Sequence, residues 1–112
     1  MSPRPASAAL LRSAPIFAAL GDPTRLHVVS RLSGGGPMSI AQLTEGVEVT
    51  RQAVTKHLEV LAEAGLVRDF RQGRERVWEL ETRRLEEARK ALDLISHRWD
   101  EALERLRGLV EE

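Results

Sequence analysis

Apolar residues recur at helical spacing through the first half of the chain and divide it into four short helices. The spacing predicts helices from Ala14 to Leu20, over Pro23–Ser33, from Ile40 to near Gly46, and over Arg51–Ala64. Each is preceded by a side chain that can accept a hydrogen bond from a free backbone N–H of the first helical turn: Ser13, Asp22, Ser39 and Thr50.

The period changes in the second half of the chain. Leu66–Arg71 and Glu75–Leu80 are typical of short strands, and Gln72-Gly73-Arg74 between them predicts a hairpin whose register the sequence leaves open. Thr82 is then expected to cap a final helix over about residues 82–110, roughly 40 Å long. Apolar residues repeat along it in steps of three and four: Leu85, Ala88, Leu92, Ile95, Trp99, Ala102, Leu106 and Leu109.

Together these elements predict a mainly α-helical fold with a small β-hairpin, in the order α-α-α-α-β-β-α. Two helices joined by a tight turn and followed by a basic hairpin are typical of a winged helix-turn-helix. We expect this domain to span residues 14–112. Residues 1–13 are expected to form a flexible arm, because Met1–Pro15 holds three prolines and no acid. A transit peptide is the alternative for the same residues.

The final helix carries a longer apolar stripe than one small domain can cover. We therefore expect it to pair with the first helix and with a second copy of the chain, giving a two-fold homodimer. The alternative is a helix folded wholly onto its own domain. The expected interface residues are Ile16, Phe17, Leu92, Ile95, Trp99, Leu103 and Leu106.

Charge is distributed unevenly although the net charge of the 112 residues is zero. The segment from Arg51 to Arg76 contains six Lys/Arg and four Asp/Glu. The segment from Glu79 to Glu112 contains seven Lys/Arg and ten Asp/Glu. A basic middle segment supports a surface that attracts phosphate. Cysteine is absent, which excludes disulfides and thiolate chemistry, and no apolar run approaches the ~20 residues of a membrane span. These features favour the cytoplasm and no membrane partner.

The helix over Arg51–Ala64 would turn hydrogen-bonding side chains to solvent near its start. Ala53, Val54, Leu58 and Leu61 share its inner face. The outward residues are Arg51, Gln52, Thr55, Lys56 and Glu59. Arginine pairs with guanine, glutamine with adenine, and lysine with phosphate, so double-stranded DNA is the expected partner. A solvated polar face is the alternative.

The predicted hairpin contains four arginines within nine residues: Arg68, Arg71, Arg74 and Arg76. They favour contacts with phosphate or the minor groove. The alternative is a charged edge that prevents strand pairing.

Several motifs in order resemble the ArsR-type regulators. Leu20–Arg25 is similar to their L-x-D-P-T-R start, Arg51–Leu58 to their recognition helix, and Leu61–Val67 to L-x-x-A-G-L-V, while Gln72–Arg74 with Trp78 resembles the wing. The resemblance covers about residues 17–80. It implies a dimeric repressor that leaves its operator when a signal arrives, with Gln52, Thr55 and His57 contacting DNA and Arg74 at the wing tip. His57 can instead pack against the turn.

The full set of expected DNA-binding residues is Ser39, Thr50, Arg51, Gln52, Thr55, Lys56, His57, Arg71, Arg74 and Arg76.

The metal-sensing ligands implied by the resemblance are largely missing. The third helix has no cysteine, and Asp93 and His97 form the only candidate pair on the last helix. We expect no cofactor and no metal, and the effector stays unknown. The alternatives are a metal-responsive repressor that uses Asp93 and His97, or a winged-helix protein-interaction module that does not bind DNA. An enzyme is not expected, because no phosphate-binding loop, nucleophile elbow or catalytic set is recognisable.

Overall fold

The computed structural model describes residues 5–111. The elements follow the predicted order, with one additional helix and one additional strand. In chain order they are α1 (Pro5–Arg12), α2 (Ala14–Leu20), α3 (Pro23–Gly35), β1 (Met38–Ser39), α4 (Ile40–Thr44), α5 (Arg51–Glu63), β2 (Val67–Gln72), β3 (Glu75–Leu80) and α6 (Thr82–Glu111).

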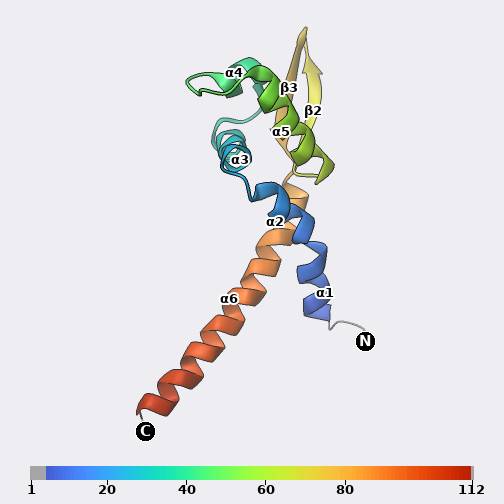
Figure 1. Cartoon of the computed structure of the whole chain (residues 1–112). Coiled ribbons are helices and arrows are strands. Elements are labelled where there is room, and N and C mark those ends of the chain that lie inside the picture. Colours follow the sequence, from blue (N-terminus) through green and yellow to red (C-terminus); the bar gives the residue numbers. More distant parts are fainter. Residues whose placement is uncertain (1–4, 112) are drawn as a thin grey trace.

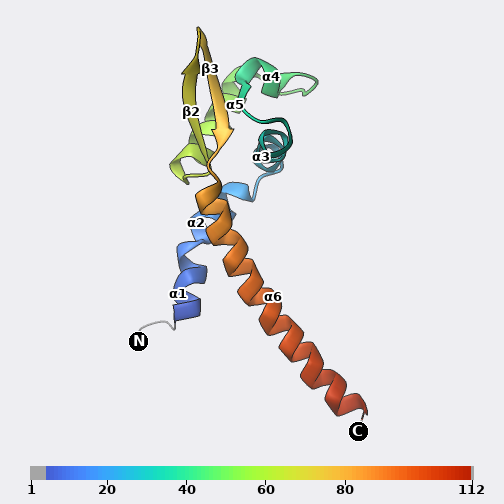
Figure 2. The same cartoon turned by 180° about the vertical axis from the view of Figure 1, so that it is seen from behind.

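Helix α6 gives the molecule its elongated shape. The principal extents are 66 × 33 × 20 Å, and α6 extends away from the body formed by α2–α5 and the hairpin (Figures 1 and 2). Its first half packs against α1 and α2, whereas its second half projects alone within the described part of the chain. No helix among residues 5–111 is both long and apolar enough to span a membrane.

Side-chain caps set three of the four helix starts that the sequence predicted. The exception is Ser13, which makes no side-chain cap on α2, because its hydroxyl donates to the Ala9 carbonyl at 3.2 Å. Asp22 accepts a hydrogen bond from the Arg25 backbone N–H, and Thr50 accepts one from that of Ala53. Ser39 and Gln42 form a complete capping box at the start of α4. These short helices therefore begin at defined residues and present fixed first turns.

Helix α5 ends in a Schellman motif. The backbone N–H of Leu66 donates to the carbonyl of Leu61, and that of Gly65 donates to Ala62. Gly65 has a positive φ of 80°, a conformation that glycine adopts without steric cost. The chain thus reverses directly from α5 into β2.

The sheet has three antiparallel strands in the order β1-β3-β2. In the hairpin, Gln72 pairs with Glu75 and Val67 with Leu80, so Gly73 and Arg74 form a two-residue turn. Gly73 has a φ of 65°, and no described non-glycine residue has a positive φ, as expected for a type II′ turn. Strand β1 was not predicted. It adds only two residues beside β3.

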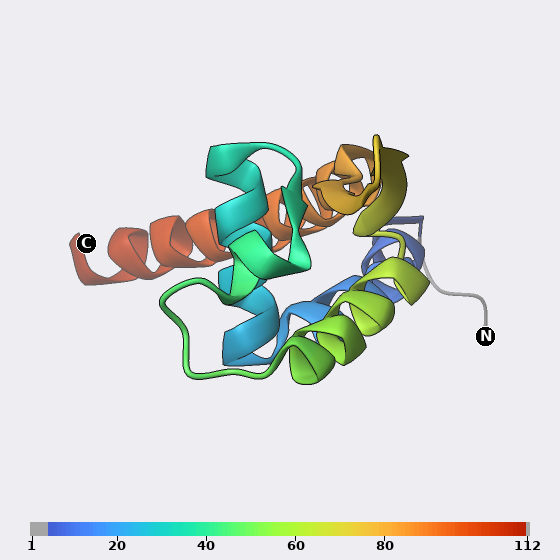
Figure 3. The same cartoon turned by 90° about the horizontal axis from the view of Figure 1, so that it is seen from above.

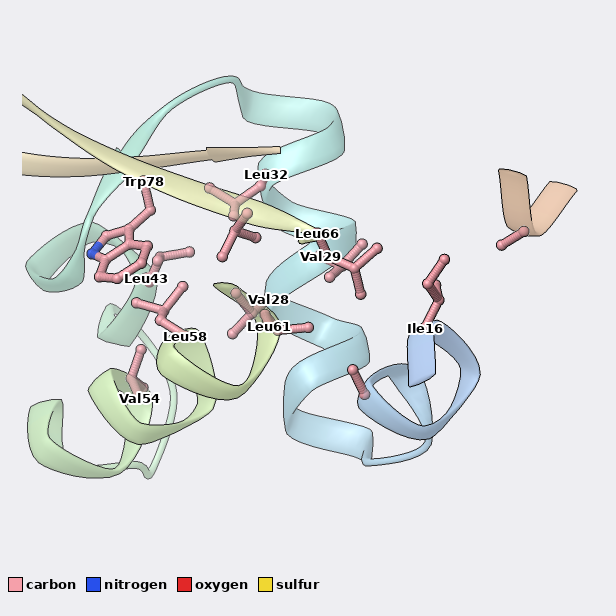
Figure 4. Close-up of a cluster of buried hydrophobic side chains, with 13 residues drawn as sticks. Ile16, Val28, Val29, Leu32, Leu43, Val54, Leu58, Leu61, Leu66 and Trp78 are labelled. Atoms are coloured by element: carbon pink, nitrogen blue, oxygen red, sulfur yellow. The ribbon is translucent and has the colours of Figure 1, made fainter. Parts of the chain in front are cut away.

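The core lies between the hairpin and helices α2–α5 (Figure 4). Trp78 extends from β3 toward Leu43, Leu58 and Val54, and all four side chains are buried. Of the four residues predicted for the inner face of α5, Val54, Leu58 and Leu61 are buried and Ala53 is half-buried. This packing fixes the hairpin and the outer face of α5 in one rigid unit.

The N-terminal segment differs from the expected arm. Residues Pro5–Arg12 are helical and pack against α6, while the rest of the expected arm before Pro5 lies outside the described residues. Ile16 also differs from its expected place in a dimer interface. It is only 2% exposed and belongs to the core of its own chain, so it has no surface left for a partner.

Candidate nucleic-acid interface

The first turns of α5 present the predicted polar side chains to solvent. Thr50, Arg51, Gln52 and Lys56 are exposed. Thr55 is half-buried, and its hydroxyl donates to the Arg51 carbonyl at 2.8 Å, which leaves the hydroxyl oxygen able to accept a hydrogen bond. This surface offers donors and acceptors on an element that the core holds in place.

Arg31 joins α3 to the end of α4, a contact that was not predicted from the sequence. The guanidinium Nη1 of Arg31, on α3, donates to the carbonyls of Gln42 at 2.8 Å and Leu43 at 3.1 Å. These carbonyls lie in the last turn of α4, where Gln42 also accepts a hydrogen bond from the Glu45 backbone N–H at 3.3 Å. Arg31 therefore ties α4 to α3 and fixes the geometry of the helix-turn-helix.

Ser39 does not lie on the exposed surface as expected. It is 7% exposed, and its hydroxyl oxygen accepts a hydrogen bond from the Gln42 backbone N–H at 3.2 Å. The capping box occupies this side chain, so the geometry assigns it to the start of α4 and away from a DNA contact.

His57 lies at a junction between α5 and the start of α3. Its Nδ1 is 3.8 Å from Asp22 Oδ2 and 3.5 Å from Nη1 of Arg25. Arg25 also donates through Nε to the Ala19 carbonyl at 2.6 Å and so reaches α2. The partly buried His57 joins three helices in this arrangement, which favours the packing role over a DNA contact.

Asp22 at this junction has a shifted pKa. The hydrogen bond from the Arg25 backbone N–H is the main cause that lowers the pKa of the Asp22 carboxyl below its usual value, and the Arg25 charge adds to it. The carboxylate is therefore ionised at neutral pH and caps α3 in its stronger, charged form.

The hairpin arginines fall into two groups. Arg68 Nε donates to Glu79 Oε1 and Arg76 Nε to Asp69 Oδ2, both at 2.6 Å, and the guanidinium of Arg76 also lies 4.6 Å from the ring centroid of Trp78. Arg71 and Arg74 near the tip have no ion-pair partner within residues 5–111. The tip thus carries two arginines that no ion pair neutralises, beside the exposed carboxylate of Glu75.

The start of α5 and the hairpin tip lie at the same end of the molecule. Both are at the end opposite the C-terminus of α6 (Figure 1), and Figure 3 looks directly onto this end. A polar helix end and a basic hairpin tip are therefore presented to one side, where a duplex could contact both.

Asp93 and His97 are both exposed on α6 and have other partners. Asp93 Oδ2 is 3.2 Å from Arg89 Nη1, and His97 Nε2 is 3.1 Å from Glu101 Oε1. No set of three or more His, Asp or Glu side chains within the described range is arranged to hold a metal ion. Within one chain, these two residues belong to a row of i,i+4 ion pairs.

Comparison with known proteins assigns the helix-turn-helix. Residues 20–69 match the model of a helix-turn-helix domain family. The HTH-type transcriptional regulator Rv2034 of Mycobacterium tuberculosis is 38% identical over 93 residues, which cover 83% of each chain. The solved ArsR-like transcriptional regulator from Rhodococcus sp. RHA1 is 32% identical, with a TM-score of 0.72 over 88% of this chain and 92% of that one. The chain belongs to the ArsR-type family of winged helix-turn-helix regulators.

The ArsR-type assignment agrees with the cysteine-free sequence and with the predicted function. The chain is a DNA-binding transcriptional regulator, and proteins of this family and fold are not enzymes. The transcriptional repressor SdpR of Bacillus subtilis is also similar, at 29% identity over 65% of this chain and 80% of that protein.

Proposed function

We propose that the chain is a cytoplasmic repressor that binds a palindromic operator as a homodimer. The observation that carries the proposal is the common placement of the α5 start and the unpaired Arg71 and Arg74 at one end of the molecule, within the part of the chain that the structure describes. A helix N-terminus fits the major groove, and basic hairpin side chains beside it fit the flanking backbone.

In this proposal, α5 and the β2–β3 hairpin have different roles in DNA recognition. Arg51 and Gln52 can form two-point hydrogen bonds to guanine and adenine, and are exposed on the first turn of α5. Arg71 and Arg74 carry charge on a hairpin around Gly73, without a fixed partner among the described residues. We assign sequence specificity to α5 and salt-dependent affinity to the wing.

The homodimer is supported by the apolar side of α6. Large side chains along it are more than half exposed, although their spacing is that of a packed helical seam: Leu92, Trp99, Leu103, Leu106 and Leu109. Ion pairs such as Arg89–Asp93 and His97–Glu101 occupy another side of the same helix. A second copy can cover the apolar stripe and leave the ion pairs in solvent. Phe17, Ile95 and Leu106 remain in the proposed interface.

The repressor assignment is supported by relatives whose names describe repressors, among them SdpR. A dimer bound across a promoter blocks transcription by occupying the DNA that the polymerase needs. The proposed inducing signal has no assigned binding site, and metal is not favoured because Asp93 and His97 pair with other side chains.

Selection of duplexes from a random pool tests the proposal in one experiment. A two-fold dimer that inserts two α5 helices should select an inverted repeat with half-sites about 10 base pairs apart, or a multiple of this spacing. A single unrepeated site would contradict the dimer. If the protein retains no duplex even at low salt, DNA binding itself is contradicted and the protein-interaction alternative is favoured.

A further inference from the structure

Asp69 lies beside the wing arginines and carries charge of the opposite sign. Its Oδ2 accepts a hydrogen bond from Arg76 Nε at 2.6 Å, with both side chains about half exposed. This hydrogen bond is the main cause that lowers the pKa of the Asp69 carboxyl, and the Arg76 charge adds to it, so the carboxylate is ionised at neutral pH. A negative charge is thus fixed on the hairpin that we propose to contact phosphate.

The strand register places this pair on the face of the hairpin that turns toward the helices. Asp69 pairs with Trp78 and Arg71 with Arg76, so these four side chains share one face. Trp78 on that face is buried in the core, and Arg76 lies over its ring. Arg76 therefore has its position fixed by two contacts, on the side of the wing nearest α5.

Carboxylate and phosphate compete for the same guanidinium donors. While Asp69 holds Arg76, the pair carries no net charge, and a contact from Arg76 to phosphate first requires that this ion pair be broken or shared. Arg71 stands directly opposite Arg76 in the register, and the carboxylate offsets the repulsion between the two like charges.

We infer that Asp69 limits the affinity of the wing for DNA by holding Arg76 away from phosphate. Removal of the Asp69 charge would free Arg76, which already lies over the Trp78 ring, to contact phosphate together with Arg71 and Arg74. The inference rests on the wing contact proposed above. It adds a residue whose role is to weaken binding, which keeps the regulator able to leave its operator and random DNA.

The matched control is Glu79, which forms the same kind of ion pair on the same hairpin. Arg68 Nε donates to Glu79 Oε1 at 2.6 Å, but this pair lies on the opposite face, and Arg68 keeps Glu81 at 3.8 Å as a second partner. Asp69→Asn and Glu79→Gln change the net charge equally. A difference between them therefore reports the release of Arg76 and not the general charge of the protein.

The experiment measures the affinity of the full chain for a mixed-sequence duplex over a series of salt concentrations. Asp69→Asn should bind on the order of tenfold more tightly per protomer near 0.1 M salt, and steepen the salt slope by about one. Glu79→Gln should change both much less. In an Arg76→Gln background, Asp69→Asn should lose most of its gain.

Equal gains in Asp69→Asn and Glu79→Gln, or an undiminished gain without Arg76, would overturn the inference. Asp69→Ser serves as a second variant, with thermal unfolding as the check that the hairpin is intact. Arg74→Ala in the same titration separates the two proposals. If Arg74→Ala lowers the salt slope while Asp69→Asn leaves it unchanged, the wing contacts DNA and only the role of Asp69 is wrong; if neither moves it, the wing contact also fails.

Discussion

At the scale of single residues, Gln52 and Arg74 are the clearest test of how recognition is divided. Gln52→Ala should cost roughly 1–3 kcal/mol on the selected operator and relax the base preference at one position per half-site, because a two-point contact to a base edge is lost. Arg74→Ala should weaken all duplexes similarly and lower the salt slope by about one per protomer. Competition binding with single-base variants of the operator measures the base preference, and the same affinities at several salt concentrations measure the slope.

The opposite pattern would reverse the assignment. If Gln52→Ala keeps the base preference of the wild type while Arg74→Ala loses affinity only for particular bases, the wing recognises sequence and α5 only docks.

Asp22 gives a prediction on pH. Because its folded pKa is lowered, the charged carboxylate stabilises the folded state at pH values above the unfolded pKa, and this contribution is lost as the pH falls through the lowered folded pKa. The Asp22→Asn variant would keep a good cap without charge. Wild type should therefore be more stable than Asp22→Asn at neutral pH, and the difference should shrink in acid. Chemical unfolding at several pH values measures it, and a difference independent of pH would contradict this account.

At the scale of elements, the sequence predicted what depends on local signals. The starts of α3, α4 and α5 follow from caps within three residues, as at Asp22 and Thr50, and the turn at Gly73 follows from glycine between two strands. Strand β1 was missed because its two residues form only by pairing with β3, as in Met38 with Trp78.

The same limit applies to the candidate site. Exposure of Arg51, Gln52 and Lys56 follows from helical spacing and could be predicted. The contacts of Arg31 and Asp69 join residues seven to twelve positions apart through the fold. Spacing along the chain does not indicate such pairs. The contact of Arg31 with α4 and the ion pair of Asp69 with Arg76 could therefore be found only from the structure.

Gly73 tests whether the hairpin depends on its turn. Its positive φ is strained for any side chain although the space around it is open, so Gly73→Ala should lower the free energy of unfolding by about 1–3 kcal/mol. Gly108 in α6 is the matched control, since its surroundings are also open but its backbone is helical. There Gly108→Ala should instead add about 0.5–1 kcal/mol. Denaturant titrations compare them, and equal effects at the two positions would rule out turn strain.

At the scale of the whole molecule, the projecting half of α6 decides whether two α5 helices act together. Its apolar stripe includes Trp99, which is 64% exposed in one chain. Such a row of large apolar side chains is costly in water and is covered in stable proteins by another surface. Because α6 leaves the body at the end opposite the hairpin tip (Figure 1), pairing through it keeps both DNA-facing ends free.

Trp99→Asp should therefore yield a monomer that keeps its fold but loses most of its affinity for an inverted repeat. The new charge would be buried in the interface of a dimer but stays in water in a monomer, so it opposes association and not folding. Arg105→Gln changes the net charge equally at a position outside the apolar stripe, and should remain dimeric. Sedimentation at concentrations on the order of tens of micromolar distinguishes the two states. A wild-type monomer under these conditions would contradict the dimer, and a Trp99→Asp dimer would move the interface elsewhere on the chain.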